Sequence, residues 1–164
     1  MKNPAIETLI EAIESVHSLT VWYISMLKDT DVNKNFEVNG IKLNNVFWLT
    51  AHLANSENLL LLKALGAKAH HLDWLKDYSL GSSKDEIPTI SYEEVKISAK
   101  KIHLDSIAHL RSLSDEDLTK ENLIGFDIGG SKSFKSIIMH HIRHEGIHAG
   151  HLGTLCKLNN IKTI

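Results

Sequence analysis

Residues 133–158 read SFKSIIMHHIRHEGIHAGHLGTLCKL, and this stretch decides the fold class. It contains no proline, and its apolar residues recur every three or four positions, which is the signature of an amphipathic helix. Within 12 residues it carries five histidines: His140, His141, His144, His148 and His151. At about 100° per residue, all five lie within an arc of roughly 100° on the apolar face. We therefore predict a helix over about 133–158 whose histidines point toward a core.

Three further stretches contain no strong helix breaker: 5–39, 41–65 and 89–124. In the first, an apolar stripe starts at Ile6, Asn3 is the predicted N-cap, and Pro4 suits the first helical position. The second is predicted to form a helix over 45–65 that ends at Gly66, because glycine commonly terminates helices.

The third stretch opens with Ser91 and Glu94, the two polar members of a capping box. Residues 67–90 show no sustained periodicity and are predicted to form a long surface connection, a kind of loop that often carries function. Residues 35–43 and 123–128 fit short strands, although too little pattern remains for a sheet. Four amphipathic helices of roughly 20–26 residues predict an all-α fold, an antiparallel four-helix bundle with long inter-helix loops.

The composition excludes several classes of protein. A length of 164 residues suits one domain with its own core, so we expect a single domain over 1–164. The 18 Lys and Arg against 20 Asp and Glu give a net charge of −2, without the basic stripe that nucleic-acid binding needs. No apolar run has membrane-spanning length, and the single cysteine, Cys156, cannot form an internal disulfide. We expect a cytoplasmic protein that acts on a small molecule, with no nucleic-acid or membrane partner.

The clustered histidines indicate a metal site. Leaving several buried imidazoles without partners costs on the order of 1–3 kcal/mol each. His144 and His148 are four residues apart, so both rings can turn a nitrogen toward one ion. His151 lies one turn further and is either a fourth ligand or a group that contacts a ligand. His140 and His141 are expected to lie outside the ligand set or at the mouth of the site.

The same run matches the H-E-x-x-H pattern of zinc peptidases, in which the glutamate is a general base. Those enzymes take a third ligand from downstream, but position 154 is threonine and no acidic residue follows Glu145. We therefore read the match as accidental and expect the third ligand upstream. His52, His17 and His109 all lie on apolar helix faces, and periodicity does not rank them.

The whole-chain pattern carries a family resemblance. Residues 47–54, FWLTAHLA, place a tryptophan beside His52, and residues 144–151, HEGIHAGH, follow some ninety residues later. This arrangement resembles the DinB-like metalloprotein superfamily, in which a tryptophan-flanked histidine on the second helix joins an H-x-x-x-H-x-G run on the fourth. The resemblance spans nearly the whole chain. The family usually has glutamine where this chain has His151 and often has histidine where it has Ile147.

The resemblance implies that His52, His144 and His148 bind one divalent ion, Zn, Ni, Fe or Mn, with water completing the coordination. It also implies a thiol-dependent S-transferase or a hydrolase, with a low-molecular-weight thiol as a possible cosubstrate. Trp48, His17, His109 and His141 are expected to line the pocket. Glu145, about 100° from His144 around the helix, is expected either to support the site or to be solvated.

Two other interpretations stay open. In the first, the metal only holds the bundle together, in a non-catalytic or stress-related binding protein. In the second, Glu14-x-x-His17 and Glu145-x-x-His148 supply a di-iron site, but helix three offers carboxylates only in its first turn. Glu57 is expected to be solvated or ion-paired, and His70, His71 and His103 need no special role.

The far side of the 133–158 helix is small and apolar. Gly146, Gly150 and Gly153 lie about 200° from the proposed ligands, and each glycine costs a helix about 1 kcal/mol relative to alanine. Close packing is expected to compensate for this cost. We predict a homodimer through this surface, and packing against another helix of the same chain is the alternative.

Overall fold

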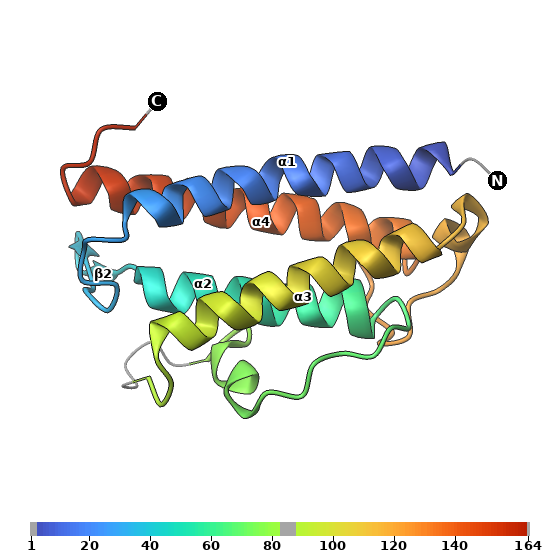
Figure 1. Cartoon of the computed structure of the whole chain (residues 1–164), viewed down its shortest axis with the longest axis horizontal. Coiled ribbons are helices and arrows are strands. Elements are labelled where there is room, and N and C mark those ends of the chain that lie inside the picture. The colour runs from blue at the N-terminus through green and yellow to red at the C-terminus, as the bar shows by residue number, and fades with distance from the viewer. Residues whose placement is uncertain (1–2, 83–87, 164) are drawn as a thin grey trace.

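The computed structural model describes residues 3–82 and 88–163 of the chain, and four helices account for about half of its length. They are α1 (Pro4–Met26), α2 (Val46–Glu57), α3 (Tyr92–Ser112) and α4 (Phe134–Leu158). Figure 1 shows the four lying side by side in one bundle, which confirms the predicted all-α fold. Among the described residues, no helix combines the length and apolarity that crossing a membrane requires.

The helix directions differ from the antiparallel order expected from the sequence. In Figure 1, α2 and α3 run in one direction, whereas α1 and α4 run in the opposite direction. α1 packs mainly on α4, and α2 packs mainly on α3. After α2, residues 64–82 carry the chain back along the bundle (Figure 1). A connection of that length lets two consecutive helices lie parallel, whereas short loops force an antiparallel pair.

The second helix continues past Glu57 as the π-helix η1 (Asn58–Lys63), so the helical segment ends close to the predicted position. Gly66 follows with a positive φ of 90°, which favours glycine. The Asn58 side chain accepts a hydrogen bond from the His70 amide at 2.8 Å and donates one to the His70 carbonyl at 3.1 Å. These two bonds tie the long connection to the helix.

The first helix is capped in a different way from the one predicted. Pro4 occupies the first turn as expected, but the Asn3 side chain makes no cap and donates instead to the Leu113 carbonyl at 3.2 Å. The carboxylate of Asp115 accepts from the backbone amides of Ala5 and Ile6, at 3.1 and 3.0 Å. An acidic group from the 3₁₀-helix η3 (Asp115–Thr119) therefore satisfies the free amides of α1.

The third helix begins as predicted, with both hydrogen bonds of the Ser91–Glu94 capping box in place. Residues 35–43 form a small hairpin, β1 (Glu37–Val38) and β2 (Ile41–Lys42), joined by an Asn-Gly turn with positive φ at both residues. Short strands were predicted in this segment, but their pairing into a sheet was not. Residues 123–128 are not a strand, and only an isolated bridge joins Ile128 to Ser131.

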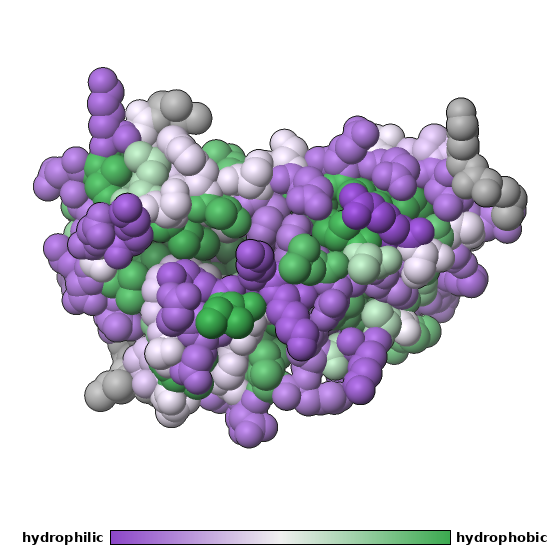
Figure 2. All heavy atoms as spheres, viewed as in Figure 1, coloured by the Kyte–Doolittle hydropathy of each residue, from purple (hydrophilic) through white to green (hydrophobic). Residues whose placement is uncertain are grey.

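Two apolar clusters fill the core, one toward each end of the bundle. One contains buried residues of α2 and the C-terminal half of α4, including Leu49 and Leu152. The other contains the N-terminal part of α1 and the start of α4, including Ile13 and Ile137. Buried histidines and glutamates lie between the two clusters along the helices. Figure 2 shows apolar side chains gathered between α1 and α3 on the face viewed.

The glycine side of α4 faces α1. A Cβ atom at Gly153 would lie 2.9 Å from Cζ of Tyr23, and one at Gly146 would lie 3.6 Å from Cγ2 of Val16. A Cβ atom at Gly150 would meet nothing within 4 Å. Intrachain packing therefore accounts for the small residue at position 153.

Candidate metal centre

Three histidines from two helices turn their Nε2 atoms toward one point. His52 comes from α2, and His144 and His148 come from successive turns of α4. Nε2 of His144 lies 3.1 Å from Nε2 of His52 and 3.1 Å from Nε2 of His148. An ion about 2.0–2.1 Å from each imidazole holds such nitrogens about 3.0–3.4 Å apart. The spacing of the three nitrogens therefore suits one shared ion.

The His52 ring is fixed on both sides. Its Nδ1 donates a hydrogen bond to the Tyr78 carbonyl at 2.7 Å, so in the neutral ring the lone pair is on Nε2. Trp48 stacks on the ring, with centroids 4.5 Å apart and planes 16° from parallel. Tyr78 ends the 3₁₀-helix η2 (Asp73–Tyr78) in the long connection. The connection thus orients a residue of the site.

His148 and His151 contact each other through Nδ1 atoms 3.2 Å apart. When the proton is on His148 Nδ1, the ring donates to His151 and leaves Nε2 free toward the centre. His151 is exposed, and it contacts Nδ1 of His148, whereas Nε2 of His148 faces His144. In the parts of the chain that the structure describes, the ligand atoms close enough to share one ion here belong to His52, His144 and His148, and His151 is not among them.

The three rings favour the neutral state. Burial lowers the pKa of all three rings, that of His144 to about 3 and that of His148 to about 4. Repulsion from the neighbouring rings further lowers the pKa of His144 and His148. Nε2 of His144 faces two other imidazole nitrogens, and protons on neutral rings satisfy only one of these contacts. A cation satisfies all three, because each lone pair then points to it. The donor set therefore fits a divalent ion.

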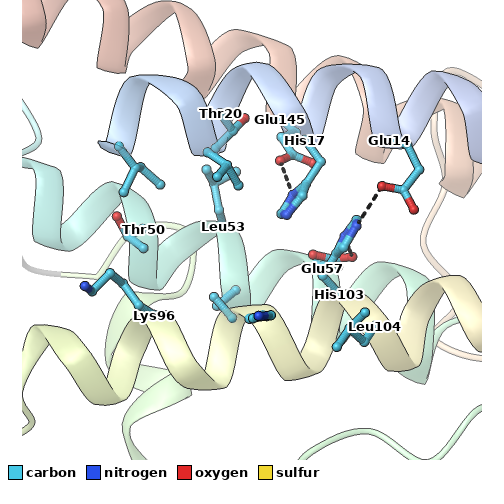
Figure 3. Close-up of a pocket in the computed structure, with 15 residues that line it drawn as sticks. Glu14, His17, Thr20, Thr50, Leu53, Glu57, Lys96, His103, Leu104 and Glu145 are labelled. Atoms are coloured by element: carbon cyan, nitrogen blue, oxygen red, sulfur yellow. Dashed lines mark hydrogen bonds and ion pairs between the residues drawn. The ribbon is translucent and has the colours of Figure 1, made fainter. Parts of the chain in front are cut away.

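Glu145 points away from this centre. Its Oε1 accepts a hydrogen bond from His17 Nδ1 at 2.9 Å (Figure 3). Its Oε2 lies 3.4 Å from His141 Nε2. Only 2% of Glu145 is exposed, so the expectation of a solvated side chain is wrong. Burial raises its pKa, but the two neighbouring imidazoles outweigh burial and hold the pKa well below its ordinary value. The position of Glu145 does not suit the general base of a zinc peptidase.

The remaining sequence candidates lie in other surroundings. His109 donates from Nε2 to the Leu65 carbonyl at 3.1 Å, which gives it a structural partner instead of a place at the site. His141 is 1% exposed and faces Glu145. His17 lines a separate cavity between α1 and α3. These positions correct the expectation that the three line the metal pocket.

His140 lies next to the centre, with its ring centroid 5.9 Å from that of His144. It accepts a hydrogen bond from Arg143 at 2.9 Å, and Phe126 contacts its ring edge-on. This position agrees with the outer place expected for it.

His103 and Glu57 are buried residues for which no functional role was predicted from the sequence. His103 Nδ1 lies 3.0 Å from Oε1 of Glu57, and the two residues are 7% and 5% exposed. The ion-paired alternative for Glu57 is correct. No spacing motif joins the two positions, since they belong to different helices, so only the packing of α2 on α3 shows the pair.

The sequence profile of the DinB superfamily matches residues 12–152, which include all three converging histidines. The chain belongs to the DinB superfamily. No curated protein matches the chain. Proteins of the DinB superfamily bind metal, and His52, His144 and His148 form a group whose geometry can hold a metal ion.

Proposed function

We propose that this DinB-superfamily protein is a metal-dependent enzyme, either a thiol-dependent S-transferase or a hydrolase, that acts on a small molecule. His52, His144 and His148 would hold one divalent ion, Zn, Ni, Fe or Mn. Imidazole nitrogens suit several of these metals, so the donor set alone selects none of them. A low-molecular-weight thiol is the proposed cosubstrate of the transferase.

One observation carries the proposal. Within residues 3–82 and 88–163, this group of candidate ligands consists of three imidazoles, and His151 contacts Nδ1 of His148 without belonging to the group. Structural zinc sites are closed by four protein ligands, whereas catalytic sites use three and keep a position for water or substrate. Three ligands therefore favour a reactive centre over a metal that only holds the bundle together.

The surrounding residues have separable roles in this proposal. A bound divalent ion supplies Lewis-acid chemistry and lowers the pKa of a water or thiol near neutral pH. The Tyr78 carbonyl and Trp48 hold His52 in the orientation that presents Nε2. His151 would accept a hydrogen bond from Nδ1–H of His148 and so keep that ring in the tautomer whose Nε2 binds the ion. His144 is half-buried, so a small molecule would approach the centre from the side of His144.

The net charge of −2 supports a small-molecule substrate, because nucleic-acid binding depends on clustered positive charge. We also propose a cytoplasmic location, since the lone Cys156 is a buried free thiol that suits a reducing compartment.

The experiment compares purified wild-type protein with His148→Ala and with the matched control His70→Ala, whose histidine pairs with Asp105 outside the centre. Each protein is loaded with each of the four metals and assayed with small thiols plus an electrophilic aryl halide, and with nitrophenyl esters. We expect activity in wild type and His70→Ala and a loss of about 100-fold or more in His148→Ala. If the metal stabilises the fold and no metal yields activity on either substrate class, the structural role replaces this proposal.

A further inference from the structure

A second group of ionisable side chains lies in the middle of the bundle, between the two apolar clusters. All four long helices contribute to it. We call it the mid-bundle cluster, and it consists of Glu14 and His17 from α1, Glu57 from α2, His103 from α3, and His141 and Glu145 from α4. Figure 3 shows most of these side chains meeting at one end of the cavity between α1 and α3.

The contacts in this cluster join imidazoles to carboxylates. His103 lies between two glutamates, with Nδ1 3.0 Å from Glu57 and Nε2 3.4 Å from Glu14. His17 pairs with Glu145 at 2.9 Å. The His17 and His103 rings stack face to face, with centroids 3.6 Å apart and planes 7° from parallel. The two imidazole–carboxylate groups therefore form one connected unit.

The charge balance of the cluster is unusual for a protein core. Glu57 and Glu145 are 5% and 2% exposed, and their ion pairs within residues 3–82 and 88–163 are made with histidines. Burying a carboxylate costs several kcal/mol unless a cation and hydrogen bonds compensate. Burial lowers the pKa of His103, but Glu57 and Glu14 outweigh burial and raise it above its ordinary value. A proton on His103 thus supplies the positive charge that the glutamates need.

Some of the buried polar atoms lack hydrogen-bond partners. Oε2 of Glu145 and both ring nitrogens of His141 are buried, and none makes a hydrogen bond within the described residues. His141 is 1% exposed, and its Nε2 faces Glu145 Oε2 at 3.4 Å. Buried polar groups are nearly always hydrogen-bonded, so the hydrogen bonding of the cluster is incomplete at Glu145 and His141.

We propose that the mid-bundle cluster is a second divalent-cation site, separate from the three-histidine centre. Its core ligands are His17, Glu57 and His103, whose ligand atoms all lie within 4.8 Å of one another. Glu14 and Glu145 surround them with further carboxylate oxygens. Because an imidazole binds a metal in its ring plane, the stacked rings turn relative to each other when the ion replaces the proton of His103.

The ligands of this second site include carboxylate oxygen, whereas those of the three-histidine centre are all imidazole nitrogens. Two imidazoles with one or more carboxylates suit Fe²⁺ and Mn²⁺, because these ions bind both nitrogen and oxygen ligands. The cavity of about 440 Å³ between α1 and α3 gives the ion a route from solvent. Its walls are mostly apolar, including Val21 and Leu104, and Lys96 and Lys100 lie along it.

This assignment also explains how two Glu-x-x-His motifs are used. Glu14 and His17 both belong to the mid-bundle cluster, whereas Glu145 belongs to it and His148 belongs to the first centre. α4 turns its side chains by about 100° per residue, so Glu145 and His144 face different sites. The two Glu-x-x-His motifs therefore do not form one dinuclear site. α3 contributes His103 to the mid-bundle cluster instead of a carboxylate.

The test counts Mn²⁺ ions bound by metal-free full-length protein, using the loss of the free-ion electron paramagnetic resonance signal and elemental analysis. We expect two ions per chain in wild type and in the control His70→Gln. Glu57→Gln, which keeps the side-chain shape, is expected to bind the second ion about tenfold or more weakly while retaining the first. His148→Ala is expected to lose the first ion and keep the second.

Each result of this experiment has a distinct meaning. One ion in wild type that disappears in His148→Ala and is unchanged in Glu57→Gln overturns the second site and leaves the three-histidine centre intact. An ion that survives His148→Ala but weakens in Glu57→Gln supports the second site, even if the first centre proves inactive. If Glu57→Gln melts at a much lower temperature than wild type, His17→Gln on the half-buried side of the cluster replaces it, with the same expected counts.

Discussion

Glu145 accepts a hydrogen bond from His17 at 2.9 Å, on a face of α4 turned away from its sequence neighbour His144. One residue step along a helix therefore separates two groups of ionisable side chains. His144 faces the three-histidine centre, and Glu145 faces the mid-bundle cluster.

The buried Glu145 carboxylate is expected to matter for stability. Glu145→Ala leaves His17 and His141 without their acidic partner, and we expect the free energy of unfolding to fall by about 3 kcal/mol. Urea denaturation at pH 7 measures this loss. The control is Glu93→Ala, which removes an exposed pair with Lys96 and is expected to cost less than about 1 kcal/mol. An equal loss of unfolding free energy in the two variants would contradict the expectation that the buried Glu145 carboxylate stabilises the fold.

His151 is expected to support metal binding indirectly. His151→Ala removes the partner of His148 Nδ1, so affinity at the three-histidine centre should fall by about 10- to 100-fold without being abolished. His148→Ala removes a ligand and should abolish specific binding at that centre. Zinc titration calorimetry compares the two variants. A loss in His151→Ala as complete as in His148→Ala would show that His151 is itself a ligand.

Acid is expected to destabilise the metal-free protein. The pKa of His144 is lowered from 6.5 to about 3 and that of His148 to about 4, mainly by burial. As pH falls below 6.5, the unfolded rings take up protons and the folded rings do not, so stability is lost between about pH 6.5 and 4. The urea midpoint should fall less steeply over this range in a His144→Gln, His148→Gln variant. Identical pH profiles would contradict the lowered pKa values.

The glycines of α4 are expected to differ in their tolerance of a methyl group. Gly153→Ala places Cβ 2.9 Å from Tyr23 and should destabilise the protein by about 1–3 kcal/mol. Gly150→Ala meets nothing within 4 Å and should stabilise it by up to about 1 kcal/mol, because alanine favours helix. Thermal unfolding of both variants gives the comparison. Stabilisation by both substitutions would show that α1 and α4 are not tightly packed at Gly153.

The homodimer through the glycine side of α4 remains a prediction, although Gly153 itself packs against Tyr23 of α1. On this side of α4, Met139 is 53% exposed, and Gly150 is also exposed. Light scattering at micromolar concentration should give twice the chain mass, and Met139→Glu should shift the protein toward the monomer by placing charge in an apolar contact. A monomeric mass for wild type would count against the dimer.

Much of the fold follows from local signals. The Ser91–Glu94 box, the apolar periodicity of α4 and the His144–His148 spacing each involve residues within one helix, and the structure shows all three. Local periodicity fixes the angle of a side chain around its own helix. The sequence by itself therefore determined the helices, their inward faces and the histidine pair.

Tertiary packing decided the rest, because it alone determines which helix lies opposite a given face. The long connection let α2 and α3 run parallel, and its Tyr78 carbonyl became the partner of His52. The same packing brought Glu57 against His103 and turned Glu145 toward His17, pairs separated by 46 and 128 positions along the chain. No spacing rule within a helix links residues so far apart, since their meeting depends on how whole helices bury their apolar surfaces against one another.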